Sequence, residues 1–158
     1  MRIIVYVFLL YLLAFYYTIM AEAMTVYGAT LDLVGLLVAI VAVYRGTTAS
    51  IWFAISAAIV AATTRLDLMP WQILSLAGMA VFVNQVCFRL NLDSILSKLA
   101  ILGIFLLVHN ATISLAISSA DFLYTFYRYI IPGVIYTVIA GWILFSVLDG
   151  IFGLNRSD

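Results

Sequence analysis

The sequence predicts an all-α fold, a polytopic membrane helix bundle of about six transmembrane helices. Hydrophobic residues make up 67% of the 158 residues and charged residues 9%, whereas ordinary proteins carry about 25% charged residues. The charges are separated by apolar runs of roughly 15–20 residues, which suits helices that cross a hydrocarbon core about 30 Å thick. These runs do not alternate between apolar and polar residues as barrel strands do. A single integral membrane domain, residues 1–158, therefore accounts for the chain.

The first three expected spans cover residues 3–20, 31–44 and 47–64. The first is rich in tyrosine and phenylalanine and lacks a clean cleavage site, so we interpret it as a retained helix rather than a signal peptide. The second is short for a crossing and is expected to include part of 26–30. The third repeats small residues every four positions, a spacing that lets two helix backbones approach closely in lipid. These small residues are Ser50, Ala54, Ala58 and Ala62, and an internal helix contact is favoured over a subunit contact.

The last three expected spans cover residues 69–88, 99–117 and 132–152. Pro70 and Pro132 fall in the first turn of the fourth and sixth spans, where the N–H that proline lacks would have no helical partner. Continuous apolar runs of this length are typical of membrane helices.

The distribution of basic residues predicts that both chain ends lie in the cytoplasm, an N-in/C-in topology. Cytoplasmic connections carry an excess of lysine and arginine over short loops. In this orientation the opposite side carries only Arg65 and Arg128. The cytoplasmic side carries Arg2, Arg45, Arg89, Lys98 and Arg156.

Several functional classes find no support in the sequence. The formal net charge is 0, so no overall field attracts nucleic acid. The single cysteine, Cys87, excludes an intramolecular disulfide and any multi-cysteine metal site. The sequence has no phosphate-binding glycine loop, histidine–carboxylate metal pair or G-x-S-x-G nucleophile motif. We therefore expect no enzyme activity, no cofactor and no metal.

Four polar residues inside the expected spans are candidates for function. His109 and Asn110 lie near the middle of the fifth span, where polar groups are costly and often functional. The alternative is that they hydrogen-bond across the bundle, for example to Asn84 and Gln85 of the fourth span. These two amides lie nearer the cytoplasmic end and could also reach interfacial water. A lone histidine without a neighbouring ligand is a poor metal site.

Two carboxylates near expected span ends have simple structural interpretations. Asp32 falls in the first turn of the second helix, where a negative charge complements the helix dipole. Asp67 shares a tight loop with Arg65, and we expect a local ion pair there.

The order of several motifs resembles the bacterial rod shape-determining MreD family. Residues 27–33 (Tyr-Gly-Ala-Thr-Leu-Asp-Leu) precede a short apolar helix that ends in Tyr-Arg-Gly at 44–46, and a small-residue helix then closes near an aspartate. Residues 130–136 (Ile-Ile-Pro-Gly-Val-Ile-Tyr) resemble the opening of the family's last helix. The similarity covers roughly residues 25–150; the family's proline before the aspartate and most third-helix glycines are replaced here. The matching residues are Asp32, Arg45, Gly46 and Asp67, and the resemblance implies an architectural role for them.

The resemblance implies a non-enzymatic scaffold of the cell-elongation complex, in the inner membrane of a bacterium. Its fold would be similar to the six-helix substrate-binding subunits of energy-coupling-factor transporters. Its partners would be membrane lipid, an MreC-like bitopic membrane protein and, through it, the RodA and class B penicillin-binding protein synthase pair. It would support cell shape and peptidoglycan synthesis.

Two other functions remain open from the residues. A small-molecule uptake subunit would place His109, Asn110 and Trp71 around an outward-facing, vitamin-sized pocket. An accessory subunit of a respiratory or photosynthetic complex would direct the aromatic first helix toward lipid or pigment.

Overall fold

A computed structural model describes residues 2–20, 23, 25, 30–90, 94–118 and 121–153, and these residues are almost entirely helical, with no strand among them. The long elements are α1 (Arg2–Phe15), which continues as a π-helical turn (Tyr16–Met20), α2 (Leu33–Tyr44), α3 (Thr47–Ala61), α4 (Met69–Leu90), α5 (Ile95–Ile117) and α7 (Ile131–Gly153). Two 3₁₀ turns (Ala62–Thr64 and Leu66–Leu68) join α3 to α4, and α6 (Phe122–Thr125) with a π turn (Phe126–Ile130) leads into α7. The predicted all-α class and six principal helices are confirmed.

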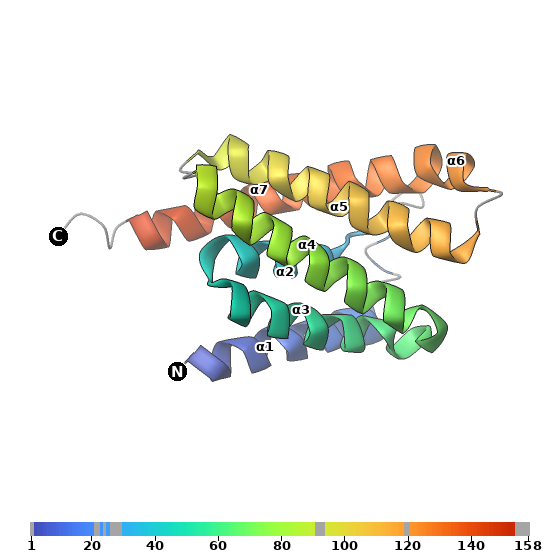
Figure 1. Cartoon of the computed structure of the whole chain (residues 1–158), viewed down its shortest axis with the longest axis horizontal. Coiled ribbons are helices and arrows are strands. Elements are labelled where there is room, and N and C mark those ends of the chain that lie inside the picture. Colours follow the sequence, from blue (N-terminus) through green and yellow to red (C-terminus); the bar gives the residue numbers. More distant parts are fainter. Residues whose placement is uncertain are drawn as a thin grey trace.

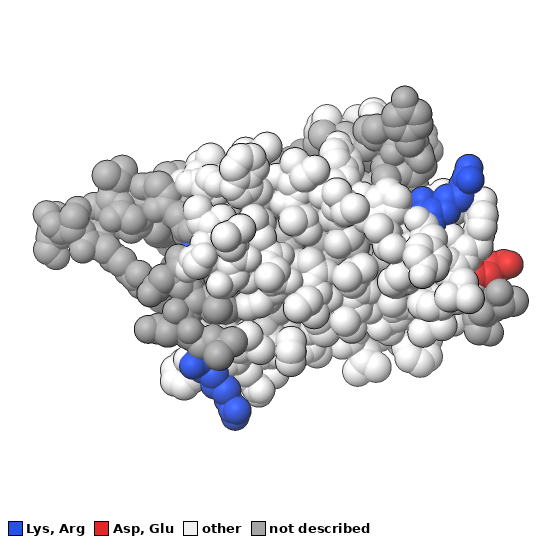
Figure 2. Space-filling model, turned by 90° about the horizontal axis from the view of Figure 1, so that it is seen from above, with Lys and Arg blue, Asp and Glu red and all other residues white. Residues whose placement is uncertain are grey.

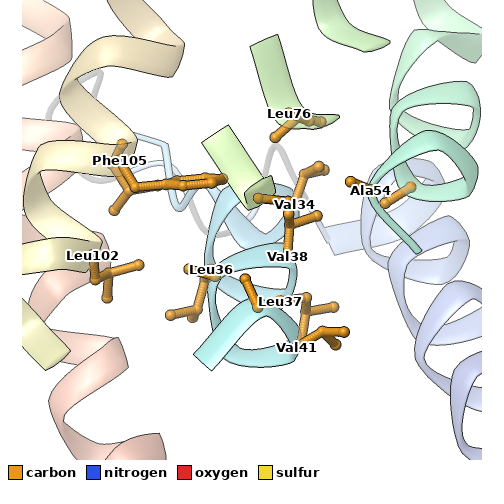
Figure 3. Packing of buried hydrophobic residues seen from close by; sticks show 14 of the residues in the cluster. Val34, Leu36, Leu37, Val38, Val41, Ala54, Leu76, Leu102 and Phe105 are labelled. Atoms are coloured by element: carbon orange, nitrogen blue, oxygen red, sulfur yellow. The ribbon is translucent and has the colours of Figure 1, made fainter. Parts of the chain in front are cut away.

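Successive long helices run in alternating directions along the bundle, so that α1 begins and α7 ends on the same side (Figure 1). α2 lies in the middle, and its residues from Val34 to Ala39 are all buried. Its side chains meet Ala54 of α3, Leu76 of α4 and residues of α5 such as Phe105 (Figure 3). The short second helix is therefore the centre of the apolar core.

The first residues of α2 and α5 differ from the prediction. α2 begins at Leu33 rather than residue 31, because the Asp32 side chain accepts a hydrogen bond from the Gly35 N–H at 2.9 Å and caps the helix. The residues 26–29 that we expected it to include lie outside the described residues. α5 begins at Ile95, four residues before the predicted start, and carries Lys98 inside its first turns.

Three segments are long and apolar enough to cross a membrane: Leu66–Arg89, Ile95–Ile117 and Phe122–Leu148. The shorter apolar helices are Ile4–Met20, Leu33–Tyr44 and Thr47–Ala61. Figure 2 shows charged side chains only toward the two ends of the long axis, with an uncharged surface between them. Length, composition and charge placement together indicate a membrane protein, because an uncharged surface of this kind suits hydrocarbon rather than water.

The four small residues predicted to recur along the third span all face the protein interior, three of them on α3 and Ala62 in the 3₁₀ turn that follows it. The side chains of Ser50, Ala54, Ala58 and Ala62 are fully buried. The Ser50 hydroxyl donates to the Val41 and Gly46 carbonyls at 3.3 and 3.1 Å. Small residues on this face allow α3 to pack closely against α2 and α4.

Candidate functional site

A group of polar side chains from four helices lies around the first turn of α2. We call this group the interior polar cluster, and it consists of Asp32, Ser75, His109, Asn110 and Thr137. The buried apolar core surrounds the same turn. Polar groups removed from water in this way must find partners within the protein.

Asp32 is the centre of the interior polar cluster. One carboxyl oxygen, Oδ1, caps α2 through the Gly35 N–H, and the other, Oδ2, accepts a hydrogen bond from Asn110 Nδ2 at 2.8 Å. The Asp32 backbone N–H donates to the Thr137 hydroxyl at 3.0 Å. One residue thus joins α2 to α5 through its side chain and to α7 through its backbone, while its position at the helix N-terminus complements the helix dipole.

The partners of Asp32 are themselves held in place. Asn110 Nδ2 also donates to the Leu106 carbonyl at 3.0 Å, and the Thr137 hydroxyl donates to the Gly133 carbonyl at 2.8 Å. The Thr137 side chain is fully buried. Each of these groups therefore makes one bond to its own helix and one bond across the bundle, which fixes its orientation.

His109 lies beside Asn110 on α5 but has a different partner. Its ring is buried, its Nδ1 atom shares a hydrogen bond with the Ser75 hydroxyl of α4, and its ring centroid lies 6.4 Å from that of Phe105. The sequence suggested Asn84 and Gln85 as partners of His109 and Asn110. They do not contact them, because residue 84 lies nine positions after Ser75, about 13 Å along α4.

The π turn after α1 covers the chain just before α2. The Tyr16 side chain is buried, and its hydroxyl donates to the Leu31 carbonyl at 2.7 Å. This carbonyl precedes α2 and also accepts a hydrogen bond from the Leu33 N–H, at the start of α2, at 3.0 Å. The first helix therefore contributes a hydrogen bond to the backbone adjacent to the interior polar cluster.

Asn84 and Gln85 have opposite environments although they are neighbours. The Asn84 amide donates to the Ala42 and Arg45 carbonyls at 3.1 and 2.7 Å, and its oxygen accepts from the Thr47 hydroxyl. It therefore joins α4 to the turn between α2 and α3 and satisfies carbonyls at the end of α2. Gln85 is exposed on the outside of α4.

The residues that carry the family resemblance do not gather at one place. Arg45 and Gly46 form the exposed turn before α3, whereas Asp67 lies beyond the other end of α3 and forms the expected ion pair with Arg65 at 3.6 Å. Asp32 belongs to the interior polar cluster. These positions are turns and caps rather than a shared binding site.

Lys98 is a feature that the sequence did not reveal. Its side chain is only 7% exposed, and its Nζ atom lies 3.5 Å from the Tyr44 hydroxyl and 5.1 Å from the Tyr44 ring centroid. Ser75 and Thr137 were also missed, because single hydroxyl residues are common in apolar helices. Within the described residues, no three His, Cys, Asp or Glu side chains come together as a metal site.

No protein-family model matches this chain, and neither does any curated protein or solved structure. Its function is therefore inferred from its residues and their geometry.

Proposed function

We propose that this chain is a non-enzymatic membrane scaffold of the bacterial cell-elongation complex, which binds the transmembrane helices of partner proteins. The main partner would be an MreC-like bitopic membrane protein, and the RodA and class B penicillin-binding protein pair would join through it. The observation that supports the proposal is that the interior polar groups already hydrogen-bond to one another.

Because the interior polar groups hydrogen-bond to one another, the outer surface is the part of the chain that can bind partner helices. The Asp32 carboxyl, the Asn110 amide, the Thr137 hydroxyl and the His109–Ser75 pair all have partners within the chain. Groups satisfied in this way stabilise a fold, whereas a catalytic or transport site needs groups that can turn to a substrate. Large apolar side chains are exposed on α1, α3, α4, α5 and α7, where lipid or partner helices would contact them.

Co-purification from the native host tests this function. After crosslinking in membranes, the tagged chain should bring down a bitopic protein, and depletion of the chain should make rod-shaped cells round. Absence of a bitopic partner, together with normal shape after depletion, would refute the scaffold.

An N-in/C-in topology in the inner membrane is part of the proposal, and Arg45, Arg89 and Lys98 at one end of the bundle support it. In a Cys87→Ser background, a membrane-impermeant thiol reagent should label Leu66→Cys in intact spheroplasts. It should label Arg45→Cys only after the membrane is opened. The reverse pattern would contradict the topology.

A second candidate function is a small-molecule uptake subunit, and one buried side-chain oxygen supports it. The Gln72 side-chain oxygen is buried and has no hydrogen-bond partner among the described residues, and it lies on α4 one turn before Ser75. A buried acceptor of this kind calls for a donor, which a ligand or a water molecule could supply. Trp71, expected beside such a pocket, is instead 48% exposed. Native mass spectrometry and thermal shifts across a vitamin panel test this candidate. A bound compound supports the uptake function. If no compound binds and none shifts the melting temperature, the uptake function is excluded.

A further inference from the structure

We propose that the outer face of α4 is the docking site for a single transmembrane helix of another protein. The partner helix would cross α4 at Gly78, pair a polar side chain with Gln85 and present a carboxylate to Arg89. This inference rests on the scaffold function and names the surface that performs it.

The two sides of α4 have distinct roles. Leu76, Ala80 and Val83 are fully buried and face the bundle. On the opposite side, exposed residues recur every three or four positions and so share one face of the helix. We call them the outer α4 stripe, which consists of Trp71, Leu74, Gly78, Phe82, Gln85 and Arg89. α4 passes in front of α2, and no other helix covers it from that side (Figure 1).

Gly78 leaves an open notch at the middle of the outer α4 stripe. A Cβ atom built onto Gly78 meets nothing within 4 Å, whereas Leu74 and Phe82, one turn away on either side, are 65% and 51% exposed. The glycines of the core differ: a Cβ on Gly35 or Gly141 would meet a leucine side chain. Internal packing explains those glycines but not Gly78. Small residues of this kind occur where two membrane helices approach closely.

Gln85 places an amide on the same face, two turns beyond the notch. It is exposed and makes no hydrogen bond within the described residues, although its neighbour Asn84 makes three. Side chains lean toward the N-terminus of their helix, so Gln85 leans away from the end that carries Arg89. Its amide is thereby directed along the apolar surface. Amide side chains in membranes hydrogen-bond across helix contacts.

Arg89 decides between a second copy of this chain and a different protein. It is exposed one turn beyond Gln85 and makes no ion pair with any described residue. Two copies in the same orientation would bring Arg89 against Arg89, and like charges repel. A different protein with a carboxylate near this end of the membrane complements the stripe.

Photo-crosslinking in membranes of the native host tests the site. A benzophenone amino acid at Phe82, between the notch and the amide, should capture one transmembrane peptide of another protein, with a hydrogen-bonding residue facing Gln85. The same probe at Ile139 of α7, which is similarly exposed at 54%, should capture only lipid. Capture of only lipid or of a second copy at Phe82 would overturn the proposal.

Two variants then test the chemistry. Gly78→Leu fills the notch and Gln85→Met removes the amide at similar length; each should lower the crosslink yield at Phe82 by about threefold to tenfold. Ala100→Leu, a matched enlargement on the exposed side of α5, should leave the yield unchanged. Equal protein levels in the membrane show that the variants fold. An unchanged yield in both variants would refute the site. If they still co-purify the bitopic partner at the wild-type level, the scaffold function stands and docking occurs elsewhere; if wild-type chain captures no partner, the scaffold itself fails.

Discussion

Replacing Asp32 with alanine should lower the free energy of unfolding by about 1.5–5 kcal/mol. Two losses make up this value. Removing the helix cap on the Gly35 N–H costs about 0.5–2 kcal/mol. Removing the acceptor of Asn110 Nδ2 leaves a half-buried amide short of one partner, which costs about 1–3 kcal/mol. Asp32→Asn should be milder, because its side-chain oxygen can still cap α2.

A double-mutant cycle isolates the bond between α2 and α5. Asp32→Ala, Asn110→Ala and the double variant are unfolded reversibly with SDS in mixed micelles, and helicity is followed by circular dichroism. Interhelical hydrogen bonds in membrane proteins average about 0.6 kcal/mol and reach about 1.7 kcal/mol. Because a carboxyl oxygen is the acceptor, we expect a coupling energy of about 1–1.7 kcal/mol.

Asn84→Ala provides the matched control. Asn84 is also a cross-bundle amide, but its hydrogen bonds join α4 to the turn between α2 and α3. Its effect and that of Asp32→Ala should therefore add to within about 0.3–0.5 kcal/mol. If the coupling energy between Asp32 and Asn110 is no larger than the deviation from additivity between Asp32→Ala and Asn84→Ala, the reasoning that the Asp32–Asn110 bond holds α2 against α5 is refuted.

Four further variants test stability in the same SDS assay. Ser75→Ala should lower the free energy of unfolding by about 1–3 kcal/mol, because it leaves the buried His109 Nδ1 atom without its partner; no change would mean that this bond contributes nothing. Asn84→Leu should cost about 2–4 kcal/mol, since three hydrogen bonds are lost together. Gly141→Val should cost about 1–3 kcal/mol, because its Cβ would collide with a leucine side chain of α5. By contrast, Gly103→Ala should add about 0.5–1 kcal/mol, as its nearest neighbour is 3.7 Å away; the opposite order of the two glycine variants would contradict the packing.

The sequence predicted the helices well because apolar length is a strong signal. The predicted ends at residues 20, 44 and 117 agree with the structure. The start of α5 was wrong because Lys98 was taken as a charge outside the bundle. A lysine has a long apolar stem and can keep its ammonium group against an aromatic ring, as Lys98 does at Tyr44. Charge alone therefore could not locate this helix start.

The candidate site was predictable only in part. The sequence indicated His109 and Asn110 as candidates because polar side chains within apolar helices need partners. Their actual partners, Ser75 and Asp32, depend on how α4, α5 and α2 are rotated and offset against each other. No periodicity in one sequence encodes that register. The hydroxyl of Thr137 gave even less signal, because it also bonds to its own helix.

The shortness of α2 explains why the interior polar cluster exists. Its 12 residues cover about 18 Å, well short of a hydrocarbon core of about 30 Å. The backbone before such a helix is irregular, and at membrane depth it is tolerated only when protein satisfies it. Tyr16 satisfies the Leu31 carbonyl, Thr137 satisfies the Asp32 N–H, and the Asp32 carboxyl caps the helix. Because most of these polar groups serve one short helix, they are committed to the fold, and the groups left for recognition are those on the outside, such as Gln85.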